Sequence, residues 1–125
     1  MHKSRLGCII IDCNTGDLDA AARFWSQALG VTCESATDPG DIYRALEMPA
    51  SEPRVLVQQV THPSRVHLDI ETDDIEAEVK RLEALGARRI EFIKRWWVME
   101  APTGHRFCVL PKQRKEFGPH LNEWP

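Results

Sequence analysis

The sequence contains no long hydrophobic run, which excludes a simple membrane-spanning protein. No stretch approaches the roughly 18 apolar residues that a transmembrane helix needs. Behind the charged start Met1–Arg5, the apolar run is only six residues long, too short for the hydrophobic part of a secretory signal. We therefore expect a cytoplasmic protein with no membrane partner.

Several motifs that would mark a particular chemistry are also missing. There is no C-x-x-C pair, no dense cysteine framework, no glycine-rich phosphate loop and no nucleophile–base–acid triad. Cys8, Cys13 and Cys108 lie in apolar runs, where a reduced cysteine acts as a small core residue. These cysteines favour a reducing compartment.

The charge and composition describe one ordinary soluble domain. With 125 residues, of which 42% are apolar, the chain is large enough for a core that needs no disulfide or metal. The net charge is -3, and the basic run Lys112, Arg114 and Lys115 is short and interrupted by Gln113. We interpret this run as a solvated tail and expect no nucleic-acid partner.

The apolar pattern near the N-terminus predicts a strand followed by a helix. Cys8–Cys13 is a short β-branched run that ends at the turn-forming segment Asn14–Gly16. Asp17 is a good N-cap, and Gly30 suits the C-terminal cap. The apolar residues between these caps fall on one helical face: Leu18, Ala21, Ala22, Trp25 and Leu29.

The same order of elements is repeated in the second half. Val66–Glu71 alternates as a half-buried strand does. Thr72–Asp74 supplies a helix cap, where Asp73 and Glu76 can form a capping box, and Gly86 closes the helix. The buried stripe of this helix is Ile75, Val79, Leu82 and Leu85.

After each helix the pattern changes to strands. In the second copy, Ala101–Gly104 favours a type I turn between two of them. The strands predicted there are Arg88–Lys94, Arg95–Glu100 and His105–Leu110. The strands predicted in the first copy are Thr32–Ala36, Ile42–Glu47 and Arg54–Val60.

Two strand-helix-strand-strand-strand units predict an α+β fold with two βαβββ modules. We expect one domain over residues 1–125, with module one at 6–60, module two at 65–111 and a C-terminal tail at 112–125. A curved mixed sheet, or half-barrel, with its helices outside would leave a cleft between its inner faces. Such a cleft is the default ligand site.

Several short segments carry a resemblance to a known family. They are Phe24–Trp25, Ala28–Gly30, Arg65–Ile70 with Asp73–Asp74, Ala101–Gly104, Phe107–Val109 and the end Trp124–Pro125. In this order they resemble the glyoxalase/bleomycin-resistance/dioxygenase superfamily, also called the vicinal oxygen chelate (VOC) fold, and most closely its glyoxalase-like branch. The resemblance covers residues 6–111 and implies the fold described above and a homodimer.

The resemblance also implies where a metal would bind. Metal-using members place one ligand on the first and last strand of each unit, and these positions fall at Cys8 (or Ile10), Gln58, His67 and Cys108. His67 matches the family's histidine, but Cys108 stands where those members have a glutamate. One histidine without a carboxylate suits Mg²⁺, Mn²⁺ and iron poorly, so we expect no cofactor. The alternative is Zn²⁺, which thiolate and imidazole suit.

Strand alternation extends the face of these residues. The positions that share it are Asp69 and Glu71 with His67, Asp12 with Cys8, and Arg106 with Cys108. One interpretation is a polar cleft with His67 as the catalytic acid/base and Arg106 holding an anionic substrate. For the three acids we favour the other interpretation, that they lie near strand ends in water; Arg106 could equally lie on the rim of the sheet.

The aromatic residues allow two roles. Trp96 and Trp97 are neighbours on a strand and should point to opposite faces, one to the helix side and one to the cleft or a subunit surface. A tryptophan in a cleft offers a flat surface to a planar ligand, although a core position is commoner. Phe24 and Trp25 are expected to pack the first helix against the sheet.

The predicted ligand-binding residues are Gln58, His67, Asp69, Trp96, Trp97, Arg106 and Cys108. The favoured function is binding of a small organic molecule without a complete metal site. The alternatives are a metal-dependent lyase or isomerase of glyoxalase type, less readily a dioxygenase, and a metal-free dimeric interaction protein. The sequence leaves open whether the protein is an enzyme.

Overall fold

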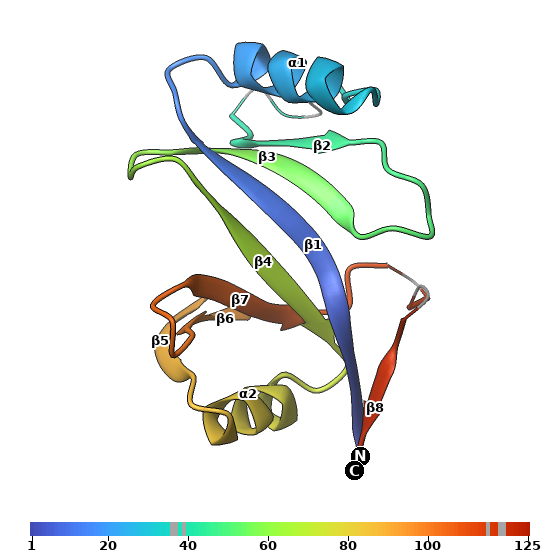
Figure 1. Cartoon of the computed structure of the whole chain (residues 1–125), viewed down its shortest axis with the longest axis vertical. Coiled ribbons are helices and arrows are strands. Elements are labelled where there is room, and N and C mark those ends of the chain that lie inside the picture. Colours follow the sequence, from blue (N-terminus) through green and yellow to red (C-terminus); the bar gives the residue numbers. More distant parts are fainter. Residues whose placement is uncertain (36–37, 39, 115, 118–119) are drawn as a thin grey trace. The chain divides into compact units, whose positions relative to one another are not determined.

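The computed structural model describes residues 1–35, 38, 40–114, 116–117 and 120–125, so Ala36 of the predicted strand Thr32–Ala36 and Lys115 of the basic run lie outside the described residues. The chain divides into two compact units, one formed by Ile9–Val66 and the other by Met1–Cys8 with His67–Pro125. Two strands, β1 (His2–Asn14) and β4 (Arg65–Thr72), have residues in both units. Each unit contains one helix (Figure 1).

In the Ile9–Val66 unit, α1 (Leu18–Leu29) packs on strands in the order β2-β3-β1. The strands β2 (Tyr43–Leu46) and β3 (Arg54–Val60) are antiparallel. Both predicted helix caps are confirmed: the Asp17 side chain accepts a hydrogen bond from the Ala20 N–H at 3.0 Å, and Gly30 is left-handed with φ of 70°. The buried core of this unit is Cys13, Leu18, Leu46, Val55 and Val57.

Two expectations for this unit are wrong. Phe24 is 60% exposed and Leu29 is 48% exposed, so neither packs α1 onto the sheet, whereas Trp25 does. Adjacent helical residues point about 100° apart, so Phe24 and Trp25 cannot both face the strands. In the described part of the predicted strand Thr32–Ala36, residues 32–35, the pairing is a single bridge between Cys33 and Leu46.

The other unit contains most of β4 and the elements that follow it. Its strands follow the order β1-β4-β7-β6-β5, and β4 pairs with β7 in parallel while β6 pairs antiparallel with both β7 and β5, so the sheet is mixed. Their bounds are β5 (Arg88–Ile93), β6 (Trp96–Glu100) and β7 (Arg106–Pro111). One face is covered by α2 (Ile75–Ala84), whose Val79 and Leu82 pack on Met99 and Val109. The expected α+β class is confirmed.

The ends of α2 differ in detail from the prediction. The N-cap is Asp74, which accepts from the Ala77 N–H at 3.0 Å, while the carboxylate of Asp73 accepts from the Lys3 N–H at 2.8 Å. The capping box of Asp73 with Glu76 therefore does not form. Leu85 is 67% exposed because it lies past the last helical turn, at the C-cap.

The turn between β6 and β7 forms where the sequence predicts it. The Gly104 N–H donates to the Ala101 carbonyl at 2.8 Å, and Gly104 has a φ of 85°, which glycine adopts without strain. Because this turn is closed by a bond from the Ala101 N–H to the His105 carbonyl, β7 begins at Arg106. The exposed His105 contacts Thr103, as expected for a turn residue.

The C-terminal segment ends in a strand that the sequence does not predict. This strand, β8 (Asn122–Trp124), pairs antiparallel with the start of β1. The Trp124 indole N–H donates to the Ser4 hydroxyl at 2.8 Å, and the Arg81 guanidinium lies 3.8 Å from the centre of the Trp124 ring. Both chain ends are thereby fastened to α2 of the same chain.

A buried carboxylate of α2 links the start of β1 to Arg81. Glu78 of α2 is fully buried, lies 2.8 Å from His2 Nε2 and accepts two hydrogen bonds from Arg81 at 2.7 and 2.8 Å. Burial alone would raise the pKa of Glu78, but hydrogen bonds from Arg81, His2 and Ser4 and the charge of Arg81 outweigh it, so the pKa lies below its ordinary value.

We predict that Glu78→Gln lowers the free energy of unfolding at neutral pH by about 3 kcal/mol, because it removes the negative charge and replaces one of the two acceptor oxygens that Arg81 and His2 contact with an NH2 donor. A depressed pKa stabilises the fold above the ordinary carboxyl range and loses that effect as the pH falls through the folded value. Urea denaturation at several pH values should therefore show the two proteins converging in acid. Glu91→Gln, at an exposed position, is the control; an equal loss in both variants would contradict this account.

Candidate functional site

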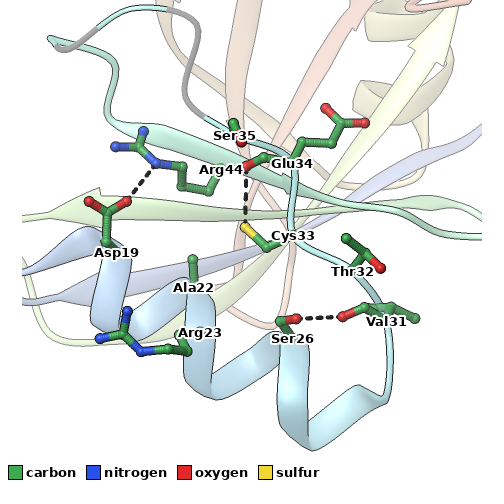
Figure 2. A pocket seen from close by; sticks show the side chains of 10 residues that line it. All are labelled: Asp19, Ala22, Arg23, Ser26, Val31, Thr32, Cys33, Glu34, Ser35 and Arg44. Atoms are coloured by element: carbon green, nitrogen blue, oxygen red, sulfur yellow. Dashed lines mark hydrogen bonds and ion pairs between the residues drawn. The ribbon is translucent and has the colours of Figure 1, made fainter.

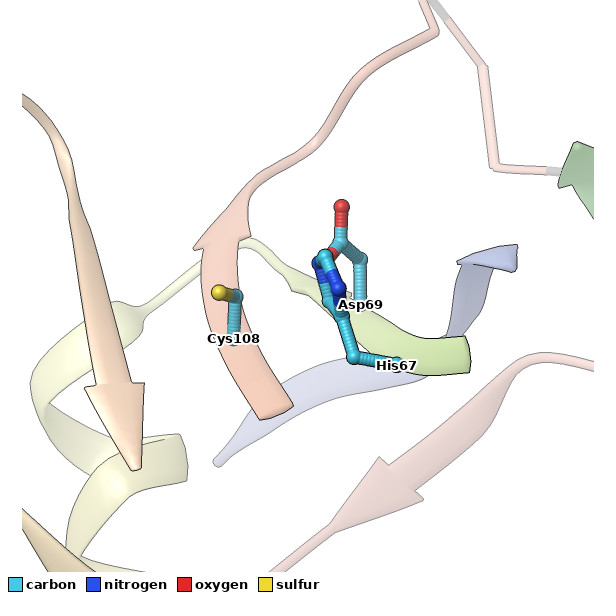
Figure 3. A group of neighbouring side chains, drawn as sticks. All are labelled: His67, Asp69 and Cys108. Atoms are coloured by element: carbon cyan, nitrogen blue, oxygen red, sulfur yellow. The ribbon is translucent and has the colours of Figure 1, made fainter. Parts of the chain in front are cut away.

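The candidate site is the face of β4 and β7 that lies away from α2. Asp69 of β4 and Cys108 of β7 are paired in the parallel register, and His67 is two residues before Asp69 on the same face. Figure 3 shows His67 and Asp69 on β4 and Cys108 on the neighbouring strand. Each of the three offers one ligand-type atom, and these atoms all lie within 4.8 Å of one another.

Within this group, His67 and Asp69 make the closest contact. His67 Nε2 lies 3.3 Å from Asp69 Oδ1, and the two side chains are 13% and 14% exposed. Asp69 Oδ1 is buried and accepts no hydrogen bond from the described residues. A carboxylate in this position can hold the imidazole ring in one orientation, which is the arrangement that general acid/base catalysis uses.

The neighbouring strands continue this face with apolar and charged side chains. Val98 of β6 is paired with Cys108, so Trp96 shares its face by alternation. Trp97 instead joins the core beneath α2, where it contacts Phe92 and the Arg89 guanidinium. The two tryptophans are therefore divided between the faces as expected, and Trp97 lies on the face opposite to Cys108.

Gln58 and Cys8, two further predicted site residues, are described by their own surroundings. Gln58 is in the Ile9–Val66 unit, where its side-chain amide donates to the Tyr43 hydroxyl at 3.1 Å. Cys8 is 3% exposed and is not part of the three-residue group. The ligand set implied by the resemblance is thus represented in the group by His67 and Cys108, and Asp69 joins them from the same face.

The expectation that the neighbouring acids lie in water is wrong. Asp12 and Glu71 are 2% and 1% exposed, because each has a cationic partner. Arg65 lies 3.6 Å from Asp12, and Arg5, itself buried, lies 3.1 Å from Glu71. Sequence alternation identified the face of Glu71 but not its partner, which comes from β1.

Arg106 is bound to a carboxylate that it shares with a second arginine. Its Nε donates to Glu100 Oε2 at 3.2 Å, and Arg88 donates to the other oxygen of Glu100. Hydrogen bonding from Arg88 is the main reason that the pKa of Glu100 lies below its ordinary value, with Arg106 contributing less. Glu100 and Arg88, which sequence analysis did not select, therefore belong with Arg106.

The donor atoms of His67, Asp69 and Cys108 suit zinc better than they suit harder ions. Imidazole, carboxylate and thiolate are all common zinc ligands, and a catalytic zinc site has three protein ligands. Mg²⁺ and Mn²⁺ prefer oxygen ligands, and an iron dioxygenase uses two histidines with one carboxylate. The side chains present therefore fit a zinc ion and do not fit the dioxygenase set.

An open depression lies in the other unit, beside α1 (Figure 2). None of the predicted ligand-binding residues lines it. The lining residues are Asp19, Ala22, Arg23, Ser26, Val31, Thr32, Cys33, Glu34, Ser35 and Arg44. Arg44 is paired with Asp19 at 3.0 Å, and burial is the main cause of the raised pKa of the Cys33 thiol. A protonated thiol and a paired arginine offer little chemistry to a ligand.

Within the described residues, no helix is long and apolar enough to cross a membrane.

Sequence comparison places most of the chain in a single family. A family model described as a glyoxalase-like domain matches residues 8–110. No curated protein matches the sequence. The matched range contains His67, Asp69 and Cys108.

Solved structures resemble the chain at low sequence identity. A methylmalonyl-CoA epimerase in complex with methylmalonyl-CoA and NH4+ is 16% identical, with a TM-score of 0.61 and coverage of 90% of this chain and 97% of that one. The methylmalonyl-CoA epimerase of Mycobacterium tuberculosis is 17% identical, with a TM-score of 0.60 and coverage of 88% and 89%. A glyoxalase/bleomycin resistance protein/dioxygenase superfamily member of Vibrio splendidus 12B01 is 16% identical, with a TM-score of 0.55 and coverage of 82% and 96%. These likenesses establish the fold.

We predict that Gly7→Ala destabilises the protein because Gly7 lies against the buried Glu71. A Cβ at position 7 would be 2.8 Å from Glu71 Cγ, and the Glu71 carboxylate is held by Arg5 and by a hydrogen bond from the Gln113 N–H. The expected loss is about 1–3 kcal/mol of unfolding free energy, measured by urea denaturation. Gly16→Ala, where a Cβ meets nothing within 4 Å, should change little and serves as the control. Equal stabilities of Gly7→Ala and the wild type would refute the close contact.

Proposed function

Since the chain belongs to the glyoxalase-like domain family, we propose that it binds a small organic carbonyl compound on the face that carries His67, Asp69 and Cys108. Membership confirms the predicted resemblance to the glyoxalase/bleomycin-resistance/dioxygenase superfamily. The methylmalonyl-CoA complex of a structural neighbour supports a small-molecule ligand for this fold.

The contact between His67 and Asp69 carries the proposal. At 3.3 Å it is short enough for the carboxylate to hold the imidazole ring in one orientation. With 13% of its side chain exposed, His67 remains accessible to a small ligand. His67 would hold or move a proton at a carbonyl oxygen or at the carbon beside it, and Asp69 would orient the ring.

The apolar neighbours define the remainder of the proposed site. Val98 lies beside Cys108 in the sheet, and Trp96 shares that face. Both are half-buried and would contact the body of an aliphatic or aryl ligand. Cys108 would contribute a small polarizable surface between them and Asp69.

A zinc-dependent lyase or isomerase is the second candidate, favoured by the three donor atoms within 4.8 Å of one another. His67, Asp69 and Cys108 would hold the ion, which supplies Lewis-acid polarisation of a bound carbonyl. The homodimer and the cytoplasmic location remain predictions.

Ligand binding should depend on His67. We expect neutral aryl ketones, with methyl benzoylformate as the reference compound, to raise the melting temperature of the wild-type protein, because a ligand that binds the folded state stabilises it. His67→Ala should abolish the rise, and Asp69→Asn should reduce it.

The control is His105→Ala, because His105 is an exposed histidine in the turn before β7. This variant should retain the full rise in melting temperature. A rise that persists in His67→Ala, or that is absent from the wild type across a library of aldehydes and ketones, would refute the proposed function.

Metal analysis separates the two candidates. If zinc binds, the protein purified after incubation with zinc should retain one equivalent, and His67→Ala, Asp69→Ala and Cys108→Ser should each lose it. Cobalt in the same site should give a thiolate charge-transfer band that Cys108→Ser removes. Cys33→Ser is the matched thiol control, since Cys33 lies in the other unit. Retention of zinc by Cys108→Ser would rule out this zinc site.

A further inference from the structure

We propose that Arg106 and Arg88, held around Glu100, form an anion subsite, and that the ligand of the His67 face is a small 2-oxo acid. The inference rests on the proposed function, because it adds a binding group for the carboxylate of the ligand whose carbonyl is bound at His67. It follows from the register of three strands and from the charge that they bring together.

The three charged residues lie in one row across the sheet. Arg88 of β5 is paired with Glu100 of β6, and Glu100 is paired with Arg106 of β7. Paired residues in a sheet point to the same face, which here is also the face of Cys108, two residues after Arg106. The row therefore borders the proposed ligand site.

The row carries an excess positive charge. Two guanidinium groups share the single carboxylate of Glu100, one on each oxygen. Within the described part of the chain, Glu100 is the only hydrogen-bond partner of Arg106, and the bond uses only Nε. Both Nη groups of Arg106 therefore retain N–H donors for a second carboxylate. Arginine commonly binds a carboxylate in a bidentate geometry, through two parallel hydrogen bonds.

Relative positions on the strands bring the anion subsite close to the acid/base group. His67 and Arg106 each lie two residues before the paired residues Asp69 and Cys108. Because β4 and β7 are parallel, both residues lie toward the same end of the two strands, which are spaced about 5 Å apart. A carboxylate at Arg106 would thus have its neighbouring carbonyl close to His67. A 2-oxo acid has these two groups directly bonded.

The test compares benzoylformate with its methyl ester, which keeps the ketone and the ring but removes the charge. We expect calorimetry at low salt to show wild-type protein binding the acid about tenfold more tightly than the ester, since the acid accepts charged hydrogen bonds from the arginines that the ester cannot accept. Raising the salt concentration should reduce the advantage of the acid and leave the ester unchanged.

Two substitutions should move the acid-to-ester ratio in opposite directions. Arg106→Gln should bring it near one, while Glu100→Gln should increase it, because the competing carboxylate is removed. Arg95→Gln, which removes an exposed positive charge from the turn between β5 and β6, should leave it unchanged. If Arg106→Gln fails to fold, the change in the acid-to-ester ratio in Glu100→Gln still tests the inference.

The outcomes separate this inference from the proposed function. If the ester binds in a His67-dependent manner and the acid binds no more tightly, the anion subsite is refuted and the proposed function stands. If neither compound binds, the 2-oxo acid inference fails, while the proposed function fails only if the library of aldehydes and ketones also leaves the melting temperature unchanged. If Glu100→Gln weakens the acid, the role given to the arginine row is wrong.

Discussion

The candidate site depends on the parallel pairing of β4 with β7. This pairing sets Asp69 beside Cys108, and the two-residue period of a strand then brings His67 to the same face. A shift of one residue in either strand would turn the polar group toward α2 and expose Val109, which is fully buried. The apolar core under α2 therefore fixes the register on which the site depends.

Buried ion pairs hold the surroundings of this sheet in place. Glu71, on the same strand as His67, is fixed by Arg5, and Glu78 on the opposite face is fixed by His2 and Arg81. Such pairs contribute little net stability compared with apolar side chains, but they are costly to break from one side. Their effect is to hold the start of β1 against β4 and α2.

Local patterns predicted most of the fold. Asp17, Gly30 and the turn Ala101–Gly104 lie where the sequence indicated, because caps and turns depend on a few adjacent residues. The strand at Thr32–Ala36 did not form, and β8 was missed, because the partner strand decides whether so short a segment pairs. Phe24 was predicted to pack with Trp25, but adjacent helical residues point in different directions, so only Trp25 faces the strands.

The site was predictable only in part. Alternation placed Asp69 on the face of His67, and the resemblance selected His67 and Cys108. The prediction that Glu71 and Asp12 are exposed to water was wrong. Burial of an acid depends on a cation from another strand, such as Arg5, and the sequence of one strand does not specify which residue it will face. For the same reason the shared carboxylate of Glu100 was not anticipated.

The most direct test of the central claim observes His67 itself. In protein labelled with ¹⁵N at its five histidines, the imidazole signals can be assigned by substitution and followed while a ketone ligand is added. The account predicts that the His67 signals shift on binding, and that Asp69→Asn changes their starting position. Shifts confined to the other histidines, or a His67 signal indifferent to a bound ligand, would contradict it.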